Sequence, residues 1–595
     1  MYQHIPKAMS RVPATLKTGV KKFFCGPESF TPDLAPAFGE TPEIQNYFVA
    51  AGMNSIGILT GRFCRFFFPY IIELSPFWYE ISMILPSFVV FSVMIGGGIG
   101  RSLAHWIING TPDVDITGMN IDRFHGYMMN ESYRKDRVEE SLGLVYKCHY
   151  PFKTKTTGRG VKFTPFFHVL KENGAYFRDV SGWECADWFL TDTCSPTERD
   201  AKLMEMGKNE TFERPVWFDN WKQEHVACRE GVMLLDMSFM SKFIVEGAGA
   251  GEALNYLSTS NVNSDCGRIT YTQWLNERGT LEADVTITKL TETKFLVIAT
   301  DTMHRHAQTW MNRHLKLKSS SPITISDVTG SMAQLNVQGP LSRAFMKLLC
   351  NEEEDSDFFS NERFAFRDVK EIEVGYAKIL CARITYLGEL GYELYIPTEH
   401  AIHVFDKVIM TKNNFVNVDK SANIRLGGLK ALASLRLEKG YRDYGHDMDN
   451  TDTLVEMGLG FTADLDKSCG FIGKDIVIQQ KRELKEKKGL LKRLVHVFID
   501  DKELGNNPER IMLYHGETLF RNGECVGDIR AGSYGHTLKG LVGLGHLTLA
   551  SDASVRVNKE YLATGDWQVE IAGTKYKAEL SLQPFYDPKN LKIKG

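Results

Sequence analysis

A regular alternation of polar and apolar residues marks the segment L-E-A-D-V-T-I-T at residues 281–288. From Glu282 onward every second side chain is polar, which is typical of a strand with one solvated and one buried face. Asp284 falls on the polar face, because residues i and i+2 of a strand point the same way. The pattern therefore predicts a half-buried strand on which Glu282 and Asp284 share a face.

A second alternating segment belongs to the sequence G-E-L-G-Y-E-L-Y at residues 388–395. Gly388 and Gly391 suit a tight turn, and Glu393 begins a strand on which Leu394 faces the other way. Taken alone, the two alternating patterns indicate a solvated acidic face and a plain hairpin, and neither pattern by itself indicates a binding site.

The densest alternation of strand-like and helix-like segments begins near Arg214. K-F-I-V-E-G at residues 242–247 predicts a strand that leads through a glycine-rich turn into a helix. Beyond a charged, helix-like segment at residues 482–488, short strands follow with turns expected at Asn522-Gly523 and Gly527-Asp528. This pattern predicts a small β-barrel or sandwich at the C-terminal end.

The N-terminal part contains an apolar segment, residues 63–95, with no clear period of two or 3.6. Residues 81–100 approach the roughly 20 apolar residues that a membrane helix needs. Pro86, a triple glycine and weak flanks argue against a membrane anchor. Residues 101–108 predict a helix, and the pattern of residues 121–144 is helical and charged.

Composition narrows the possible functions. A chain of 595 residues is expected to form three or four domains. The net charge of −4 offers no basic field for nucleic acid. Its 11 cysteines include no C-x-x-C pair, which argues against a zinc site or a disulfide framework and suits a reducing compartment. Residues 1–27 are basic and free of acids, as transit peptides are, but continue into a turn-like sequence at residues 25–33.

Glycine-rich segments give little support for a nucleotide site. G-A-G-A-G at residues 247–251 lacks dinucleotide spacing, because Glu252 would face a pyrophosphate, so a tight strand-to-helix turn is favoured. Residues 96–100 also precede a helix and are a weak signal for cofactor approach. No P-loop, H-E-x-x-H or G-x-S-x-G motif occurs, and we expect no metal site.

Seven motifs follow one another between about Arg214 and Asp587: L-L-D-M-S (234–238), residues 275–288, V-Q-G-P (337–340), residues 386–397, S-L-R-L-E-K-G (434–440), F-I-G-K-D (471–475) and R-N-G-E-C-V-G (521–527). In these motifs the chain resembles the folate-binding T-protein module of glycine cleavage. Five further segments are informative: residues 103–110, 121–125, 213–218, 438–442 and 585–590. They resemble the sarcosine dehydrogenase type more than dimethylglycine dehydrogenase or the regulatory subunit of pyruvate dehydrogenase phosphatase.

The resemblance implies an α+β multidomain fold that starts as the end of an FAD-dependent, D-amino-acid-oxidase-like α/β domain. An aminomethyltransferase fold and a small β-barrel then follow. The chain is expected to be the C-terminal part of a longer protein, with 62–95 as an insertion such as a translated intron. The expected domains are 1–110 (FAD-domain remnant), 111–213 (connecting), 214–484 (folate-binding) and 485–595 (barrel).

The resemblance also implies chemistry: FAD-dependent oxidation of the N-methyl group of sarcosine, and capture of the one-carbon unit by tetrahydrofolate. Asp284 would be the catalytic residue, and Glu393 would grip the pterin. The expected folate-binding residues are Asp284, Tyr386, Glu393, Leu394, Tyr395 and Phe461. The expected FAD-binding residues are Asn54, Ser55, Ile56, Gly57 and Ile58. Two departures, Ala283 and Leu432, stand where T-proteins have an acid and an arginine, which weakens the case for glycine-cleavage transfer.

The family further implies an electron-transfer flavoprotein as electron acceptor and a mitochondrial matrix location. Because this chain lacks the flavin fingerprint, it is expected not to oxidise sarcosine on its own. Three alternatives stay open: a non-catalytic folate-binding or regulatory protein, a dimethylglycine dehydrogenase, and a membrane-anchored protein. The last alternative is supported only by the apolar residues 63–95.

Overall fold

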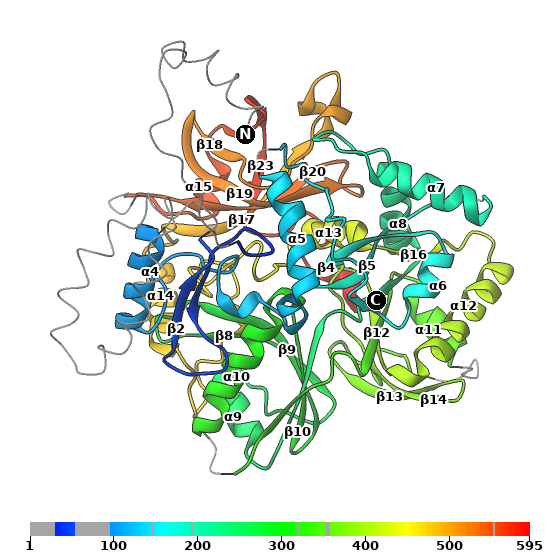
Figure 1. Ribbon diagram of the computed structural model, residues 1–595, viewed down its shortest axis with the longest axis horizontal. Coiled ribbons are helices and arrows are strands. Elements are labelled where there is room, and N and C mark those ends of the chain that lie inside the picture. Colours follow the sequence, from blue (N-terminus) through cyan, green and yellow to red (C-terminus); the bar gives the residue numbers. More distant parts are fainter. Residues whose placement is uncertain are drawn as a thin grey trace, which may run out of the picture. The chain divides into compact units, whose positions relative to one another are not determined.

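The computed structural model describes residues 30–53, 96–145, 147–191, 194–318, 321–350, 357–550 and 554–595 (Figure 1). The basic N-terminus, the apolar segment at residues 62–95 and the expected FAD-binding residues 54–58 lie outside the described residues. The chain divides into two compact units, and the larger comprises Phe38–Val49 and Ser102–Gly595. The larger unit contains the described helices and strands, except that β1 (Ala37–Glu40), β2 (Phe48–Ala51) and α4 (Gly96–Asn109) also run into the other unit.

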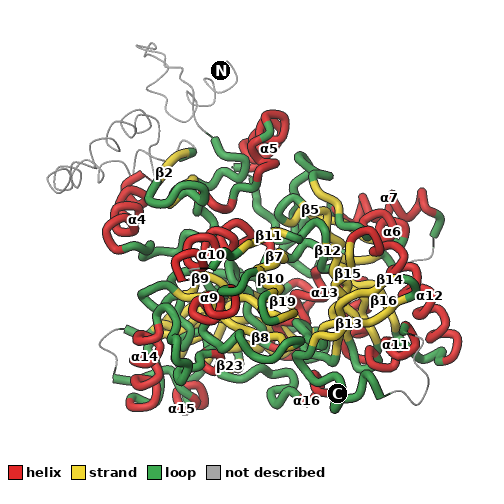
Figure 2. The backbone as a smooth tube through the Cα atoms, turned by 90° about the horizontal axis from the view of Figure 1, so that it is seen from below, coloured by secondary structure: helices red, strands yellow, loops and turns green. Residues whose placement is uncertain are grey.

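A five-stranded antiparallel sheet carries Asp284. Its strand order is β11 (Thr324–Asp327), β7 (Ser241–Glu246), β10 (Lys294–Ala299), β9 (Leu281–Thr291) and β8 (Arg268–Leu275). Helices α9 (Ala250–Leu257) and α10 (His304–Lys318) lie beside this sheet (Figure 2). Their apolar side chains share one core with Val285 and Ile287. The strand predicted at residues 281–288 is confirmed, as is the turn between β7 and α9.

The predicted pairing of Glu282 with Asp284 on one face is wrong. Trp274 pairs with Ala283 but Leu275 pairs with Leu281, so Glu282 is the extra residue of a β-bulge. The bulge turns its carboxylate toward α10, where His306 binds it. Asp284 keeps the predicted face, opposite Val285.

A six-stranded sheet carries Glu393. Its order is β13 (Val369–Val374), β14 (Ala377–Ala382), β15 (Gly391–Pro397), β12 (Met332–Gln338), β6 (Val232–Asp236) and β16 (Ile424–Gly427), with β16 parallel to β6. Helices α11 (Ser342–Leu349) and α12 (Ala401–Val418) share one core with Leu394. Glu393 and Tyr395 occupy the opposite face.

The two sheets meet through one apolar cluster. Ile269, Leu296 and Ile298 lie on the Asp284 face of the first sheet, as their strand pairing with Thr286 and Thr288 shows. The same cluster contains Ala382 and Tyr395 from the Glu393 face of the second sheet. The faces that carry the two predicted carboxylates therefore meet at this cluster.

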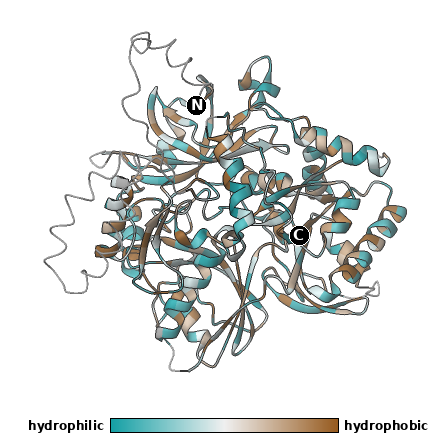
Figure 3. Cartoon of the chain, in the orientation of Figure 1, coloured by the Kyte–Doolittle hydropathy of each residue, from teal (hydrophilic) through white to brown (hydrophobic). Residues whose placement is uncertain are grey.

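The connecting region before the first sheet contains both helices and strands. The predicted helix at residues 121–144 is only partly correct: two short 3-10 helices, η4 (Ile121–Arg123) and η5 (Gly126–Met129), precede α5 (Glu131–Leu144), because Asn130 caps α5 with its side chain. Helix α5 is largely hydrophilic (Figure 3). The remaining elements are β3 (Lys162–Phe163), α6 (Phe167–Glu172), β4 (Ala175–Val180), β5 (Trp183–Phe189) and α7 (Pro196–Gly207).

A seven-stranded sheet forms the C-terminal part and confirms the predicted β-rich end. The turn at Asn522-Gly523 is confirmed, but the turn predicted at Gly527-Asp528 is wrong. Gly527 lies inside β19, where a Cβ would stand 1.9 Å from the carbonyl oxygen of His546, so close strand approach explains this glycine.

The strands of this C-terminal sheet are β17 (Lys492–Asp500), β18 (Thr518–Arg521), β19 (Glu524–Gly535), β20 (Gly540–Thr548), β21 (Trp567–Ile571), β22 (Thr574–Lys577) and β23 (Glu579–Ser581). The remaining α-helices of the described residues are α8 (Phe218–Glu230), α13 (Leu429–Lys439), α14 (Lys474–Glu486), α15 (Lys559–Ala563) and α16 (Leu591–Lys594).

Candidate functional site

Asp284 projects from β9 toward the polar side chains of Gln273 and Thr462. The side-chain amide of Gln273, its cross-strand partner on β8, donates to Oδ1 of Asp284 at 2.7 Å. The amide oxygen of Gln273 in turn accepts from the Thr462 hydroxyl at 2.6 Å. Burial raises the pKa of Asp284 to about 7, although hydrogen bonds from Gln273 and Tyr271 act in the opposite direction. Asp284 can therefore exchange a proton near neutral pH.

Burial raises the pKa of Tyr386, and the charge of Asp284 adds to this rise, so the two side chains lie within electrostatic range of each other. The Tyr386 hydroxyl donates to the carbonyl oxygen of Arg442 at 2.6 Å, and its ring stacks on Tyr441. The charges of Arg442 and Asp443 act on the pKa of Asp284 in opposite directions, Arg442 lowering it and Asp443 raising it. The segment after α13 therefore brings both a cation and a second acid to Asp284.

Glu393 is a buried carboxylate surrounded by donors. Its Oε2 accepts from the Tyr395 hydroxyl at 2.6 Å and from the Gln334 amide at 3.2 Å. Its Oε1 accepts from the Asn336 amide at 3.2 Å. Burial raises the pKa of Glu393 to about 7, against the hydrogen bonds and the charge of Lys242.

Lys242 is the cation behind Glu393. Its side chain is fully buried, and Nζ donates to the carbonyl oxygens of Ser238 and Met240 at 2.9 and 2.7 Å. Burial lowers the pKa of Lys242 to about 7, while Asp236 and Glu393 raise it. The charge of Lys242 thus lowers the pKa of Glu393, and the charge of Glu393 raises the pKa of Lys242.

Two of the predicted folate-binding side chains lie apart from the carboxylates. Leu394 points into the core on the other face of its sheet. Phe461 is 77% exposed, although the neighbouring Thr462 binds Gln273. The structure therefore pairs Glu393 with Tyr395 and places Tyr386 within electrostatic range of Asp284. The folate-binding roles of all six residues stay predictions.

Sequence reasoning missed the amides that hold the two carboxylates. Gln334, Asn336 and Gln338 alternate along the otherwise apolar β12, and all three are buried. Three buried amides on one strand face were a usable signal, because such groups need partners. Gln273 gave no such signal, because its contact with Asp284 depends on how β8 and β9 are paired, which the sequence pattern does not show.

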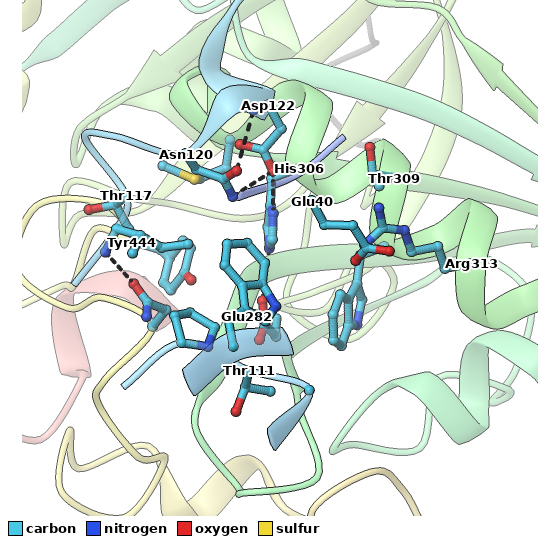
Figure 4. Close-up of a pocket in the computed structure, with 17 residues that line it drawn as sticks. Glu40, Thr111, Thr117, Asn120, Asp122, Glu282, His306, Thr309, Arg313 and Tyr444 are labelled. Carbon is cyan, nitrogen blue, oxygen red and sulfur yellow. Dashed lines mark hydrogen bonds and ion pairs between the residues drawn. The ribbon is translucent and has the colours of Figure 1, made fainter. Parts of the chain in front are cut away.

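A separate cluster ties the connecting region to β9. The imidazole of His306 binds Asp122 through Nδ1 at 2.7 Å and Glu282 through Nε2 at 2.9 Å. Figure 4 shows Asn120, Asp122 and His306 pointing toward one another beside a cavity of about 60 Å³. Burial alone would lower the pKa of His306, but the two carboxylates raise it to about 10. His306 is therefore a permanent cation at neutral pH.

Comparison with known proteins agrees with this architecture. Residues 166–467 match the GCVT N-terminal domain, and residues 492–587 match the glycine cleavage T-protein C-terminal barrel domain. The chain belongs to the GCVT family. Residues 109–164 of this GCVT-family chain match the FAD dependent oxidoreductase central domain, so the predicted succession of a part similar to FAD-dependent oxidoreductases, a T-protein fold and a barrel is confirmed.

Curated relatives of this GCVT-family chain include enzymes named for methylated amines. It is 35% identical over 99% of its length to 4-methylaminobutanoate oxidase (formaldehyde-forming) of Paenarthrobacter nicotinovorans, and covers 62% of that protein. It is 29% identical over its whole length to human mitochondrial sarcosine dehydrogenase, covering 61%. It is 30% identical over 97% of its length to the mouse mitochondrial pyruvate dehydrogenase phosphatase regulatory subunit, covering 59%. The chain thus spans about three fifths of these relatives.

Among solved structures, the chain is similar to glycine cleavage system aminomethyltransferase T from Bartonella henselae. The TM-score is 0.54 at 21% identity, over 72% of this chain and 99% of that one. This likeness shows the fold. No helix in the described part of the chain is both long and apolar enough to cross a membrane.

Proposed function

We propose that the Asp284 and Glu393 sites together bind tetrahydrofolate and pass a one-carbon unit to it. The observation that carries the proposal is Glu393, a buried carboxylate whose donors hold it in place without an ion pair to a described residue. The pterin of a folate presents adjacent N–H donors, and a carboxylate matches such an edge with two parallel hydrogen bonds.

An unpaired atom beside Glu393 supports the same ligand. Oε1 of Gln334 is buried and has no hydrogen-bond partner among the described residues. A buried acceptor without a partner costs free energy unless a ligand donates to it. The amine-bearing edge of a pterin can donate to Glu393 and Gln334 at once.

Asp284 would manage the protons of the transfer. When an N-methylene iminium gives its carbon to tetrahydrofolate, two new C–N bonds form to folate nitrogens and the bond to the amine breaks. The two folate N–H protons end on the departing amine. A carboxyl with a pKa of about 7 can accept one proton at Oδ2 and return it, while Gln273 holds Oδ1 in place.

The finer proposal is N-demethylation of sarcosine with FAD, electron-transfer flavoprotein as acceptor, in the mitochondrial matrix. Support comes from the match to a flavin-oxidoreductase central domain and from relatives named mitochondrial sarcosine dehydrogenase. The expected FAD-binding residues 54–58 lie outside the described residues, so the flavin part rests on the relatives. The domain boundaries at residues 110, 213 and 484 are proposed in the same way.

The proposal is tested with formaldehyde as one-carbon donor. The chain should accelerate condensation of formaldehyde with tetrahydrofolate to the 5,10-methylene form, followed anaerobically by absorbance. Asp284→Asn should remove the acceleration, while Glu399→Gln, at an exposed glutamate, should keep it. Rates equal to those of protein-free solution would contradict the proposal.

A regulatory role is the second candidate, because the chain is 30% identical to a phosphatase regulatory subunit. The two candidates differ in whether the folate site transfers carbon. Faster condensation of formaldehyde with tetrahydrofolate in the presence of the chain would favour the enzyme. Folate binding without any such acceleration would favour the regulatory protein.

A further inference from the structure

A second pocket of about 370 Å³ lies between the connecting region and the first sheet. Lys162, Ser181 and Trp183 line it from one side, and Asp301 and His304 from the other. None of the residues predicted to bind folate lines this pocket. Its volume lies within the range of small-molecule sites.

The cationic end of the pocket is Lys162. Its ammonium lies 4.9 Å from the ring centroid of Trp183 and 5.2 Å from that of Tyr127. Among the described residues, no oxygen accepts a hydrogen bond from this ammonium and no carboxylate forms an ion pair with it. A partly buried ammonium with three unused donors is a site for an anion.

The anionic end is Asp301. The carboxylate is 8% exposed, and its Oδ2 accepts from the Ser181 hydroxyl at 2.6 Å. Burial raises the pKa of Asp301, and the nearby charge of Asp443 raises it further. Asp443 has the same effect on the pKa of Asp284, so both carboxylates lie within electrostatic range of Asp443.

Of the other titratable groups of the pocket, Asp327 and His304 pair with each other and His125 is uncharged. Asp327 binds Nε2 of His304 at 3.0 Å and the backbone of Thr329. His125 is uncharged at neutral pH, because burial first and the charge of Lys162 second lower its pKa to about 3. Lys162 and Asp301 are therefore the two charges left for a ligand, and no ion pair joins them.

We propose that this pocket binds a small zwitterionic amino acid, with its carboxylate on Lys162 and its amine on Asp301. Separated opposite charges match a dipolar ligand, and neither a simple anion nor a simple cation would satisfy both. The rings of Trp183 and Tyr127 provide an apolar wall for the carbon chain. Because the amine released by one-carbon transfer is itself such a zwitterion, the pocket is placed to hold that product; this last step rests on the proposed function.

The test is calorimetric titration of the whole chain with glycine, 3-aminopropanoate and 4-aminobutanoate, and separately with acetate and methylammonium. Saturable binding of at least one zwitterion is expected. Each single-charge probe should bind about tenfold more weakly or worse, because it leaves one charged group without its partner. Equal binding of zwitterions and single-charge probes, or no binding of any zwitterion, would overturn the proposal.

Two variants locate the binding. Lys162→Met keeps the aliphatic stem over the rings, and Asp301→Asn keeps the shape of the carboxylate. Each should weaken zwitterion binding about tenfold, whereas Lys171→Met, at an exposed lysine, should not. Unchanged binding in Lys162→Met would overturn the proposal. Tetrahydrofolate titrations of the same samples report the folate site separately, so failure of one site is distinguishable from failure of the other.

Discussion

Replacing Glu393 with glutamine should change stability in a pH-dependent way. In the folded chain, burial raises the pKa of this carboxyl from 4.5 to about 7. A rise of this size corresponds to about 3 kcal/mol of differential stability. Because the folded-state pKa is the higher one, the folded chain binds the proton more tightly. Wild-type stability therefore falls as pH rises from about 4.5 through 7 and levels off above that.

Glu393→Gln cannot titrate, so its stability relative to wild type should rise by about 2 kcal/mol between pH 5 and pH 8. The glutamine oxygen can still accept from Tyr395, but its amide group would face the donor of Gln334 or Asn336. That conflict costs stability at every pH and leaves the pH-dependent difference unchanged.

The assay is thermal unfolding of both proteins across this pH range. A gain of 1 kcal/mol moves the midpoint by about 2–4 °C in a domain of 150–250 residues. Glu399→Gln should follow wild type at every pH. A constant difference between Glu393→Gln and wild type from pH 5 to pH 8 would refute the reasoning, because it would mean that burial does not perturb Glu393.

Three further substitutions probe the two sites and the separate His306 cluster. Asp284→Asn should lower the rate of methylene-tetrahydrofolate formation about a hundredfold with unchanged folding, and a normal rate would exclude proton transfer by Asp284. Tyr395→Phe removes a 2.6 Å hydrogen bond to Glu393, so the pKa of Glu393 should rise further and folate affinity should fall about tenfold, read from the pH dependence of binding. His306→Gln leaves two buried carboxylates without their cation and should cost about 3–5 kcal/mol in denaturant unfolding. Because the pKa of His306 is raised to about 10, that stabilisation should be complete below pH 6.5 and lost as pH rises through 10; a stability difference that stays constant up to pH 11 would contradict it.

Strand periodicity predicted the elements that carry the site, because one buried face leaves a readable pattern of period two. It placed Asp284 and Glu393 correctly on their strands. It failed at Glu282, because a bulge shifts the pattern by one residue and leaves no mark in composition. The turn predicted at Gly527 was wrong because sequence alone does not distinguish a glycine required by a turn from a glycine required by the close approach of a neighbouring strand.

The surroundings of the carboxylates were not predictable from periodicity. Gln273 contacts Asp284 because the register of β8 and β9 places them opposite each other. Gln334 on β12 contacts Glu393 on β15, which follows 59 residues later in the chain. Lys242 looks like an ordinary strand residue, yet it is completely buried behind Glu393. Long-range pairing decides which polar groups share a low-dielectric space, and pairing is a property of the fold.

The most direct test of the central claim is anaerobic calorimetric titration of the chain with tetrahydrofolate. Wild type should bind saturably, and Glu393→Gln should bind about tenfold more weakly or worse, because one hydrogen bond to a charged group is lost at the pterin edge. Equal affinity of the two folded proteins would contradict the assignment of Glu393, and no binding by wild type would contradict the folate proposal itself.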